Sequence, residues 1–300
     1  MFQVYVIITL AETLLLYLGD MNLFEAINHS FSTVSTGGFS MYQSNIAHFD
    51  SKYIQYIIIF FMYLAGANFT LSYFAVHLQF KKIIRNEEFR VYSYIIVACA
   101  LLFTIILYFN NTNHSIESYF RESLFSIVSF SSTTGFVNSN HLAWPSILIA
   151  FLLLFMVFGS SSGTTGGGLK TVRVLIVAKF AYAELKKMIH SNAIVPIYYN
   201  NHQLNNRIVS GFLTFIVCYI LTFTISVIIL SSQAIDLNSA IEIVVCSLSN
   251  IGQGIGNFGT SSDYIELSSF SRWYISLLMV LGRVEIFIAI LIISPEFFKK

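Results

Sequence analysis

Three short stretches rich in glycine recur along the chain, each among small polar residues. They are Ser35-Thr36-Gly37-Gly38-Phe39-Ser40, Ser132-Thr133-Thr134-Gly135-Phe136-Val137 and Asn250-Ile251-Gly252-Gln253-Gly254. Aligning them on Gly38, Gly135 and Gly252 places Thr36 beside Thr133. Because glycine has no Cβ, its backbone can turn carbonyl oxygens inward, and a ring of carbonyls can replace the hydration shell of an ion. The pattern predicts that backbone oxygens bind a monovalent cation.

Each stretch follows a short segment compatible with a helix and precedes a long apolar segment. The short segments are too short to cross a bilayer, which takes about 20 helical residues. Non-helical backbone at membrane depth is tolerated only where it is buried in protein or lines a water-filled cavity. The predicted unit is therefore helix, re-entrant pore helix, filter and helix. One copy alone would also suit an extracellular loop that turns at glycine, but three aligned copies favour a shared pore.

The composition is that of a membrane protein and predicts an all-α polytopic fold. Of the 300 residues, 56% are hydrophobic and 10% are charged, whereas about a quarter are charged in soluble domains. Long apolar stretches lie at residues 2–18, 53–77, 91–109, 208–230 and 273–293. Two shorter ones, at residues 144–158 and 172–183, flank a run of Gly, Ser and Thr. The first stretch is expected to be a spanning helix whose beginning is missing.

The charged residues predict the orientation of the chain. Lys and Arg cluster at residues 81–90, 170–207 and 299–300. Cytoplasmic loops collect Lys and Arg, so the three glycine stretches are predicted to face outside. Acidic residues at the outer starts of the short helices would lie at positive dipole ends and leave the negative ends aimed at the filter. These acids are Glu25, Glu117, Glu122 and Asp236.

The three stretches, together with the Gly/Ser/Thr run at residues 159–168, resemble the Trk/Ktr/HKT superfamily of potassium transporters over essentially the whole chain. Members of this superfamily fold four helix, pore helix, helix repeats around one pore. The resemblance divides this chain into a second repeat at residues 1–80, a third at 81–200 with a broken inner helix and a gate loop, and a last at 201–300. The first repeat is absent, which implies either truncation or a separate polypeptide that supplies it.

The resemblance assigns ion binding to backbone carbonyls around the glycine of each repeat. The nine residues are Thr36, Gly37, Gly38, Thr133, Thr134, Gly135, Asn250, Ile251 and Gly252. Glycine in all three segments favours potassium within this superfamily. Gln253 departs from the pattern, because related transporters often have proline there, and the rigidity of the last filter segment is expected to differ.

The run Gly159-Ser160-Ser161-Ser162-Gly163-Thr164-Thr165-Gly166-Gly167-Gly168 interrupts an apolar stretch. Each glycine costs a helix about 1 kcal/mol relative to alanine, so this run is predicted to be a loop. In the resembled superfamily a loop at this position obstructs the pore below the filter and moves aside on activation. The implied gate residues are Gly159, Gly163, Thr164, Thr165, Gly166, Gly167 and Gly168, together with Arg283.

A phosphate-binding loop is the rival interpretation of the same run. Gly163, Gly168, Lys170 and Thr171 approach the required spacing, but Leu169 adds one residue to it. The membrane segment before the run also argues against this interpretation.

Arg283 lies inside the apolar stretch at residues 273–293. An arginine at mid-membrane costs about 2.5–3.5 kcal/mol on insertion scales, so such a residue is a functional candidate. The superfamily has an arginine in this inner helix that faces the pore and contacts the gate loop, which implies an electrostatic barrier and latch. The alternative is that Arg283 pairs with Glu285 or Glu12 and only braces the bundle.

The resemblance implies a multi-pass plasma (inner) membrane protein that takes up potassium down its electrochemical gradient. Potassium would be the cargo, and neither a covalent cofactor, a catalytic constellation nor a nucleic-acid module is indicated. The implied partners are the lipid bilayer, a second identical subunit and a cytosolic nucleotide-binding regulatory subunit. Two alternatives stay open: a truncated non-conducting remnant or assembly partner, and a sodium-permeable or cation-coupled transporter of the same fold.

Overall fold

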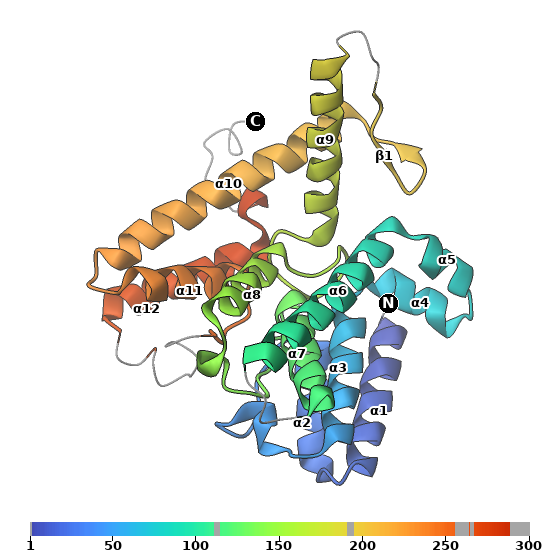
Figure 1. Ribbon diagram of the computed structural model, residues 1–300, viewed down its shortest axis with the longest axis vertical. Helices are drawn as coiled ribbons and strands as arrows, with labels where there is room; N and C mark the ends of the chain where they lie inside the picture. The colour runs from blue at the N-terminus through green and yellow to red at the C-terminus, as the bar shows by residue number, and fades with distance from the viewer. Residues whose placement is uncertain (1, 111–114, 191–194, 256–263, 265–266, 289–300) are drawn as a thin grey trace, which may run out of the picture.

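The computed structural model describes residues 2–110, 115–190, 195–255, 264 and 267–288, and helices make up most of this part of the chain (Figure 1). Three groups of three helices follow one another. They are α1 (Phe2–Leu18), α2 (Leu23–Val34) and α3 (Lys52–Gly66); α6 (Glu87–Asn110), α7 (Ile116–Ser131) and α8 (Ser146–Phe158); and α10 (Asn206–Ser231), α11 (Leu237–Leu248) and α12 (Ser269–Val284). The middle helix of each group ends at one of the three glycine stretches, as the sequence predicts.

Two helices of the described part, α6 with 24 residues and α10 with 26, are long and apolar enough to cross a membrane. The bent pair formed by α3 and α4 (Phe69–Val76) is a third candidate. The apolar helices α1, α8 and α11 are shorter. In α8 the cause is visible in the sequence, because the Gly/Ser/Thr run begins directly after Phe158.

The predicted span at residues 53–77 is not one straight helix. The chain bends by 113° between α3 and α4. The Asn68 side chain accepts a hydrogen bond from the Thr70 amide at 2.8 Å and so caps α4, a position that favours Asn. A methyl group on Gly66 would lie only 2.7 Å from Cβ of Ser132. The end of α3 therefore packs against the second glycine stretch, and α4 turns aside toward the short basic helix α5 (Phe80–Arg85).

The predicted span at residues 273–293 is not one continuous helix either. The helix α12 ends at Val284, and Glu285 has a φ of +65°. The Glu285 carboxylate pairs with Lys170 at 3.2 Å and with Arg173 at 2.7 Å. These ion pairs draw the chain toward the start of α9 (Thr171–Ile189). Gly256 and residues 289–300, which also belong to predicted features, lie outside the described residues.

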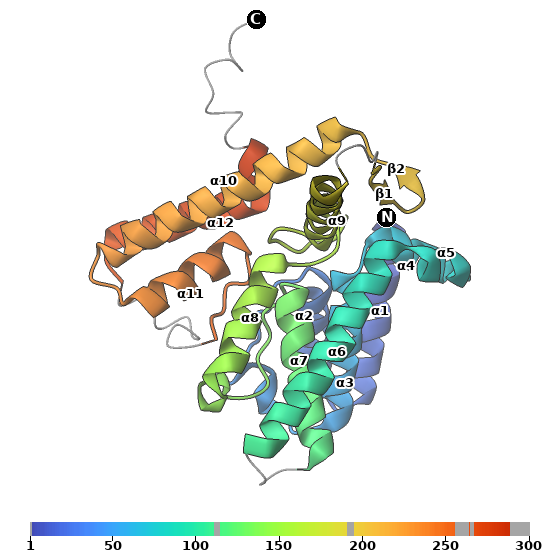
Figure 2. The same ribbon diagram turned by 45° about the horizontal axis from the view of Figure 1, so that its top comes forward.

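The middle helices α7 and α11 form the buried centre of the fold. The helix α7 lies among α3, α6 and α8 (Figure 2), and four of its five serines are buried: Ser123, Ser126, Ser129 and Ser131. Ser126 shows how: its hydroxyl donates to the Glu122 carbonyl of the same helix at 2.9 Å, which satisfies a polar group away from water. The group α10, α11 and α12 lies beside α8 in both views.

The helix α9 projects away from the three groups, and a small hairpin follows it (Figure 1). The hairpin consists of β1 (Tyr198–Tyr199) and β2 (His202–Gln203), which pair antiparallel. It lies near the start of α6, because the Glu87 amide donates to the Asn200 side chain at 2.8 Å.

Candidate ion filter and gate

The three glycine stretches have the same backbone conformation. The aligned glycines Gly38, Gly135 and Gly252 have φ angles between +71° and +84°. The residues two positions before them, Thr36, Thr133 and Asn250, have φ angles between +55° and +59°. Positive φ is uncommon outside glycine and occurs most readily in Asn and related residues. The recurrence of two such angles shows that the three segments are structurally equivalent, including the third, whose sequence resembles the others least.

The same hydrogen bond folds each segment back onto its pore helix. Amide groups at equivalent positions donate to a carbonyl of the last helical turns: Gly37 N to Ser32 O at 2.7 Å, Thr134 N to Ser129 O at 3.0 Å, and Ile251 N to Cys246 O at 3.0 Å. The carbonyl oxygens of six filter residues accept no hydrogen bond within the described part of the chain: Thr36, Gly37, Thr133, Thr134, Asn250 and Ile251. Unpaired carbonyls grouped in this way are suited to replace the hydration shell of a cation.

The filter segments lie directly against one another. A methyl group on Gly38 would overlap the carbonyl group of Thr134, and one on Gly135 would lie 2.6 Å from the carbonyl oxygen of Ile251. The first segment therefore contacts the second, and the second contacts the third. Among the described residues, no atom lies within 4 Å of a methyl group added to Gly252. The structure thus brings the nine predicted filter residues together as three adjacent sides of one site.

Behind the filter, side chains bond to the carbonyls that follow the glycines. The Ser129 hydroxyl donates to the Phe136 carbonyl at 2.7 Å, and the equivalent Cys246 thiol donates to the Gln253 carbonyl at 3.5 Å. Asn45, which the sequence analysis missed, donates from Nδ2 to the Gly38 carbonyl at 3.4 Å. Asn45 has a φ of +56°, and a conformation of this kind leaves no periodic signal in a sequence.

The predicted gate loop lies directly below the filter and contacts all three segments. The hydroxyl oxygens of Thr165 and Thr36 are 3.1 Å apart. The Gly167 amide donates to the Thr133 hydroxyl at 2.9 Å, and a methyl group on Gly167 would overlap the Ser249 carbonyl. Gly166 and Gly167 are buried. The loop is therefore packed against the candidate filter segments in this structure.

The glycines of the loop serve its turns, because Gly159, Gly163 and Gly168 all have positive φ. The helix α8 precedes this loop, whereas a phosphate-binding loop follows a strand. The phosphate-loop interpretation is therefore wrong.

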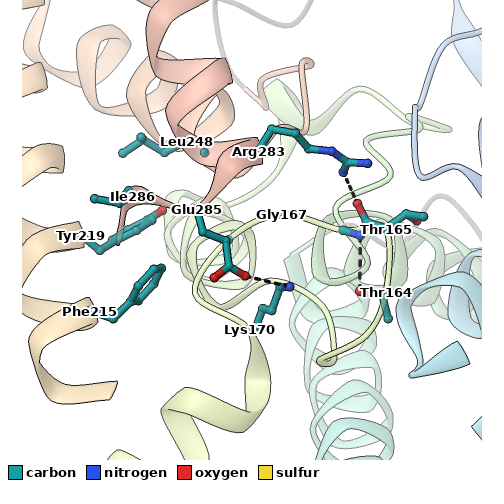
Figure 3. Close-up of a pocket in the computed structure, with 13 residues that line it drawn as sticks. Thr164, Thr165, Gly167, Lys170, Phe215, Tyr219, Leu248, Arg283, Glu285 and Ile286 are labelled. Carbon is teal, nitrogen blue, oxygen red and sulfur yellow. Dashed lines mark hydrogen bonds and ion pairs between the residues drawn. The ribbon is translucent and has the colours of Figure 1, made fainter. Parts of the chain in front are cut away.

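Arg283 contacts the gate loop, because its Nη1 donates to the Thr165 carbonyl (Figure 3). Arg283 is exposed rather than buried and lines a cavity of about 110 Å³ together with Thr164 and Lys170. The helix α12 ends one residue later, at Val284, and the Arg283 side chain faces the cavity, as expected for an arginine directed toward an ion path. The alternative pairing with Glu285 is not what the structure contains, since Glu285 pairs with Lys170 and Arg173. Arg173 was not singled out from the sequence, and Lys170 was considered only as part of the phosphate-binding pattern.

Two of the predicted acidic residues, Glu25 and Glu117, lie in the first turns of α2 and α7. The Tyr42 hydroxyl donates to the Glu25 carboxylate at 2.6 Å and lowers the pKa of Glu25. Lys52 pairs with Glu117 at 2.7 Å and is the largest influence that lowers the pKa of Glu117. Both carboxylates are therefore ionised at neutral pH, as the dipole argument requires.

Asp236 is the N-cap of α11, where its side chain accepts from the Asn238 amide. Glu122 differs from expectation, because it lies in the second turn of α7 rather than at its start. The reason is length: α7 has 16 residues, whereas α2 and α11 have 12.

Short helices that end at grouped unpaired carbonyls, with a glycine-rich loop packed against the same segments, are typical of a class of multi-pass membrane transport proteins. A family model described as TrkH, cation transport protein, matches residues 1–300. The chain belongs to this TrkH family of cation transport proteins and resides in the lipid bilayer.

Named relatives support the assignment. The Trk system potassium uptake protein TrkH of Salmonella typhimurium is 32% identical over 298 residues, which make up 99% of this chain and 61% of that protein. The Trk system potassium uptake protein TrkG of Escherichia coli is 28% identical over 94% of this chain and 58% of that protein. The crystal structure of the potassium transporter TrkH from Vibrio parahaemolyticus matches with a TM-score of 0.93 and 31% identity, covering 99% of this chain and 64% of that one. This chain thus spans less than two thirds of these relatives.

Proposed function

We propose that this chain contributes three sides of a pore that conducts potassium ions inward across the plasma membrane. The observation that carries the proposal is the set of unpaired carbonyls on three equivalent, adjacent filter segments. Potassium is proposed as the cargo because relatives that match nearly the whole chain are potassium uptake proteins. Dehydrated potassium would be held by carbonyls of Thr36–Gly38 and of their counterparts in the other two segments, with no side-chain chemistry and no resident cofactor.

The loop at residues 159–168 is the proposed gate. In its present position it contacts the inner end of every filter segment, so this arrangement corresponds to a non-conducting state. Conduction requires that Thr165 and Gly167 move away from Thr36 and Thr133. Arg283 holds the loop from the side of α12 and places a positive charge near the ion path, which opposes cation entry until the loop moves.

A fourth side is needed to close the filter. The proposed division into repeats at residues 1–80, 81–200 and 201–300 gives three sides, so one more is required. The greater length of the relatives supports an additional repeat. The same polypeptide or a separate one could supply it.

Two protein partners complete the proposal by resemblance to the superfamily: a second identical subunit and a cytosolic nucleotide-binding regulatory subunit. The basic residues Lys81, Lys82 and Arg85 support an inner docking face, because α5 has no buried residue and all three are exposed.

Growth rescue tests the function. A bacterium without potassium uptake systems would express either the 300-residue chain or the same chain extended by its upstream coding sequence, at matched membrane levels. Rescue at low external potassium by the extended form supports the proposal, and the extended form with Gly135→Ser serves as a matched filter control. Rescue by neither form, even with the regulatory subunit present, would contradict potassium uptake. Rescue that occurs only when sodium is present in the medium would favour the cation-coupled alternative.

A further inference from the structure

A single carboxylate holds the gate loop on the side opposite to Arg283. Glu88, near the start of α6, is only 1% exposed. It accepts two hydrogen bonds from Ser162 in the gate loop: one from the backbone amide at 2.6 Å and one from the hydroxyl at 2.9 Å. Ser161 is fixed as well, because its amide donates to the Gly66 carbonyl at 3.0 Å. The first half of the loop is therefore anchored on α6 and α3.

The same carboxylate is bonded to the hairpin. The Tyr199 hydroxyl donates to Oε2 of Glu88 at 3.3 Å, and this oxygen also accepts from the Ser162 hydroxyl. Burial and the Glu88 carboxylate raise the pKa of Tyr199, so the phenol remains a donor at neutral pH. Glu88 thus joins a segment after α9 to the gate loop, although the two are far apart in sequence.

The hairpin is fixed to the start of α6 by neighbouring contacts. Lys179 pairs with Glu87 and donates to the Tyr198 carbonyl at 2.8 Å. The Glu87 amide donates to Asn200. Lys179 therefore neutralises Glu87, and the charge of Glu88 is compensated in the described part of the chain by the gate loop and the hairpin.

This arrangement gives the loop a preferred position. A buried carboxylate is costly unless hydrogen bonds satisfy it, and bonds to a charged group are stronger than neutral ones. If the loop moved away with Ser162, two of the three donors to Glu88 would be lost. The loss of these hydrogen bonds to the carboxylate therefore opposes opening of the loop. A movement of Tyr199 would change how well the carboxylate is hydrogen-bonded.

We propose that Glu88 is a positioning residue that holds the gate loop in its blocking position, and that the hairpin adjusts the strength of this hold through Tyr199. A displacement of the hairpin on the predicted cytoplasmic side would thereby be transmitted to the filter gate. This inference rests on the proposed function, because it assigns a closing force to the same gate.

The test measures rubidium flux into proteoliposomes that contain the complete transporter, with rubidium as a tracer for potassium. Glu88→Gln keeps the shape of the side chain and removes its charge, and Ser162→Ala removes one of the three donors. Each change should raise the maximal flux about fivefold, because it removes about 1 kcal/mol of stabilisation from the closed state. The concentration that gives half-maximal flux should not change, because the filter is untouched. Misfolding would lower the flux, so an increase is specific to the gate.

Tyr199→Phe tests the hairpin, with Tyr198→Phe as its control, because Tyr198 contributes only its backbone carbonyl to these contacts. Tyr199→Phe should raise the flux and Tyr198→Phe should not. Combining Tyr199→Phe with Glu88→Gln should add little to the single change, since both remove the same interaction. Unchanged or lower flux in both Glu88→Gln and Ser162→Ala, or fully additive effects with Tyr199→Phe, would overturn the inference. Absence of flux in the unmodified transporter would instead count against the proposed function.

Discussion

Asn45 and Gln253 join the outer ends of two filter segments across the pore entrance, with Nδ2 of Asn45 donating to Oε1 of Gln253 at 2.9 Å. Gln253 occupies the position at which related transporters often have proline. Proline restricts the backbone by its ring, whereas Gln253 is restrained by a hydrogen bond to another repeat. Asn45 also donates to the Gly38 carbonyl, so one buried amide connects the first segment to the third.

Replacing Gln253 with leucine should loosen the outer filter. The change removes the shorter of the two hydrogen bonds of the buried Asn45 amide and leaves only the bond to the Gly38 carbonyl; one such bond contributes about 0.5–1.5 kcal/mol. We expect a lower melting temperature and weaker discrimination of potassium from sodium, measured as sodium inhibition of rubidium flux. Gln233→Leu, at an exposed site, is the matched control. Equal sodium inhibition in Gln253→Leu and the unmodified transporter would show that this bond does not shape the filter.

Gly135→Ala should abolish or severely reduce selective flux. Gly135 has a φ of +84°, and an added methyl group would lie 2.6 Å from the Ile251 carbonyl oxygen. The new side chain must therefore displace a carbonyl that is proposed to hold the ion. Gly211→Ala is the control, because an added methyl group there meets nothing within 4 Å and alanine favours the helix by about 1 kcal/mol. Normal selectivity in Gly135→Ala would contradict the proposed filter.

The stability contributed by Glu117 should depend on pH. Lys52, then Tyr56 and Arg121, lower the pKa of this carboxyl from its ordinary value of 4.5. A lowered pKa in the folded state stabilises the protein above the ordinary pKa, and this contribution is lost as the pH falls through the lowered value. The melting temperature of Glu117→Gln should therefore lie below that of the unmodified protein at pH 7, and the two should converge in acid.

The effect of Glu117→Gln should be small, because the side chain is 39% exposed and exposed ion pairs contribute little. Glu184→Gln removes an exposed pair with Lys187 on α9 and should alter the melting temperature even less. If the difference in melting temperature between Glu117→Gln and the unmodified protein grew toward low pH, the pH dependence would have the wrong sign and would contradict this account.

The equivalence of the three glycine stretches could be predicted from the sequence because it is a local property of the chain. The aligned glycines and the residues two positions before them determine backbone angles, and those angles recur in the structure. The same argument identified the gate loop, since a run of glycine and serine cannot sustain a helix. Hydropathy also located α6 and α10, whose apolar character is continuous.

The features that the sequence did not predict depend on contacts between residues that are distant in the chain. The break after α3 arises where Gly66 meets Ser132, and apolar residues on both sides conceal it from a hydropathy profile. Glu88 resembles an ordinary charged residue at the edge of a membrane span, and only the fold brings it to Ser162. Interactions of this kind leave no spacing pattern in a single sequence.

Arg283→Ala should raise basal flux without changing ion preference. The change removes the hydrogen bond to the Thr165 carbonyl and a positive charge near the ion path, so the gate loop is held less firmly and cations meet a lower barrier. Arg272→Ala, on the same helix and exposed, is the matched control and should behave like the unmodified transporter. Rubidium flux and its inhibition by sodium would be measured at equal amounts of protein. If basal flux in Arg283→Ala stayed at the unmodified level, the latch would have to lie elsewhere on the loop, at contacts such as that between Ser162 and Glu88.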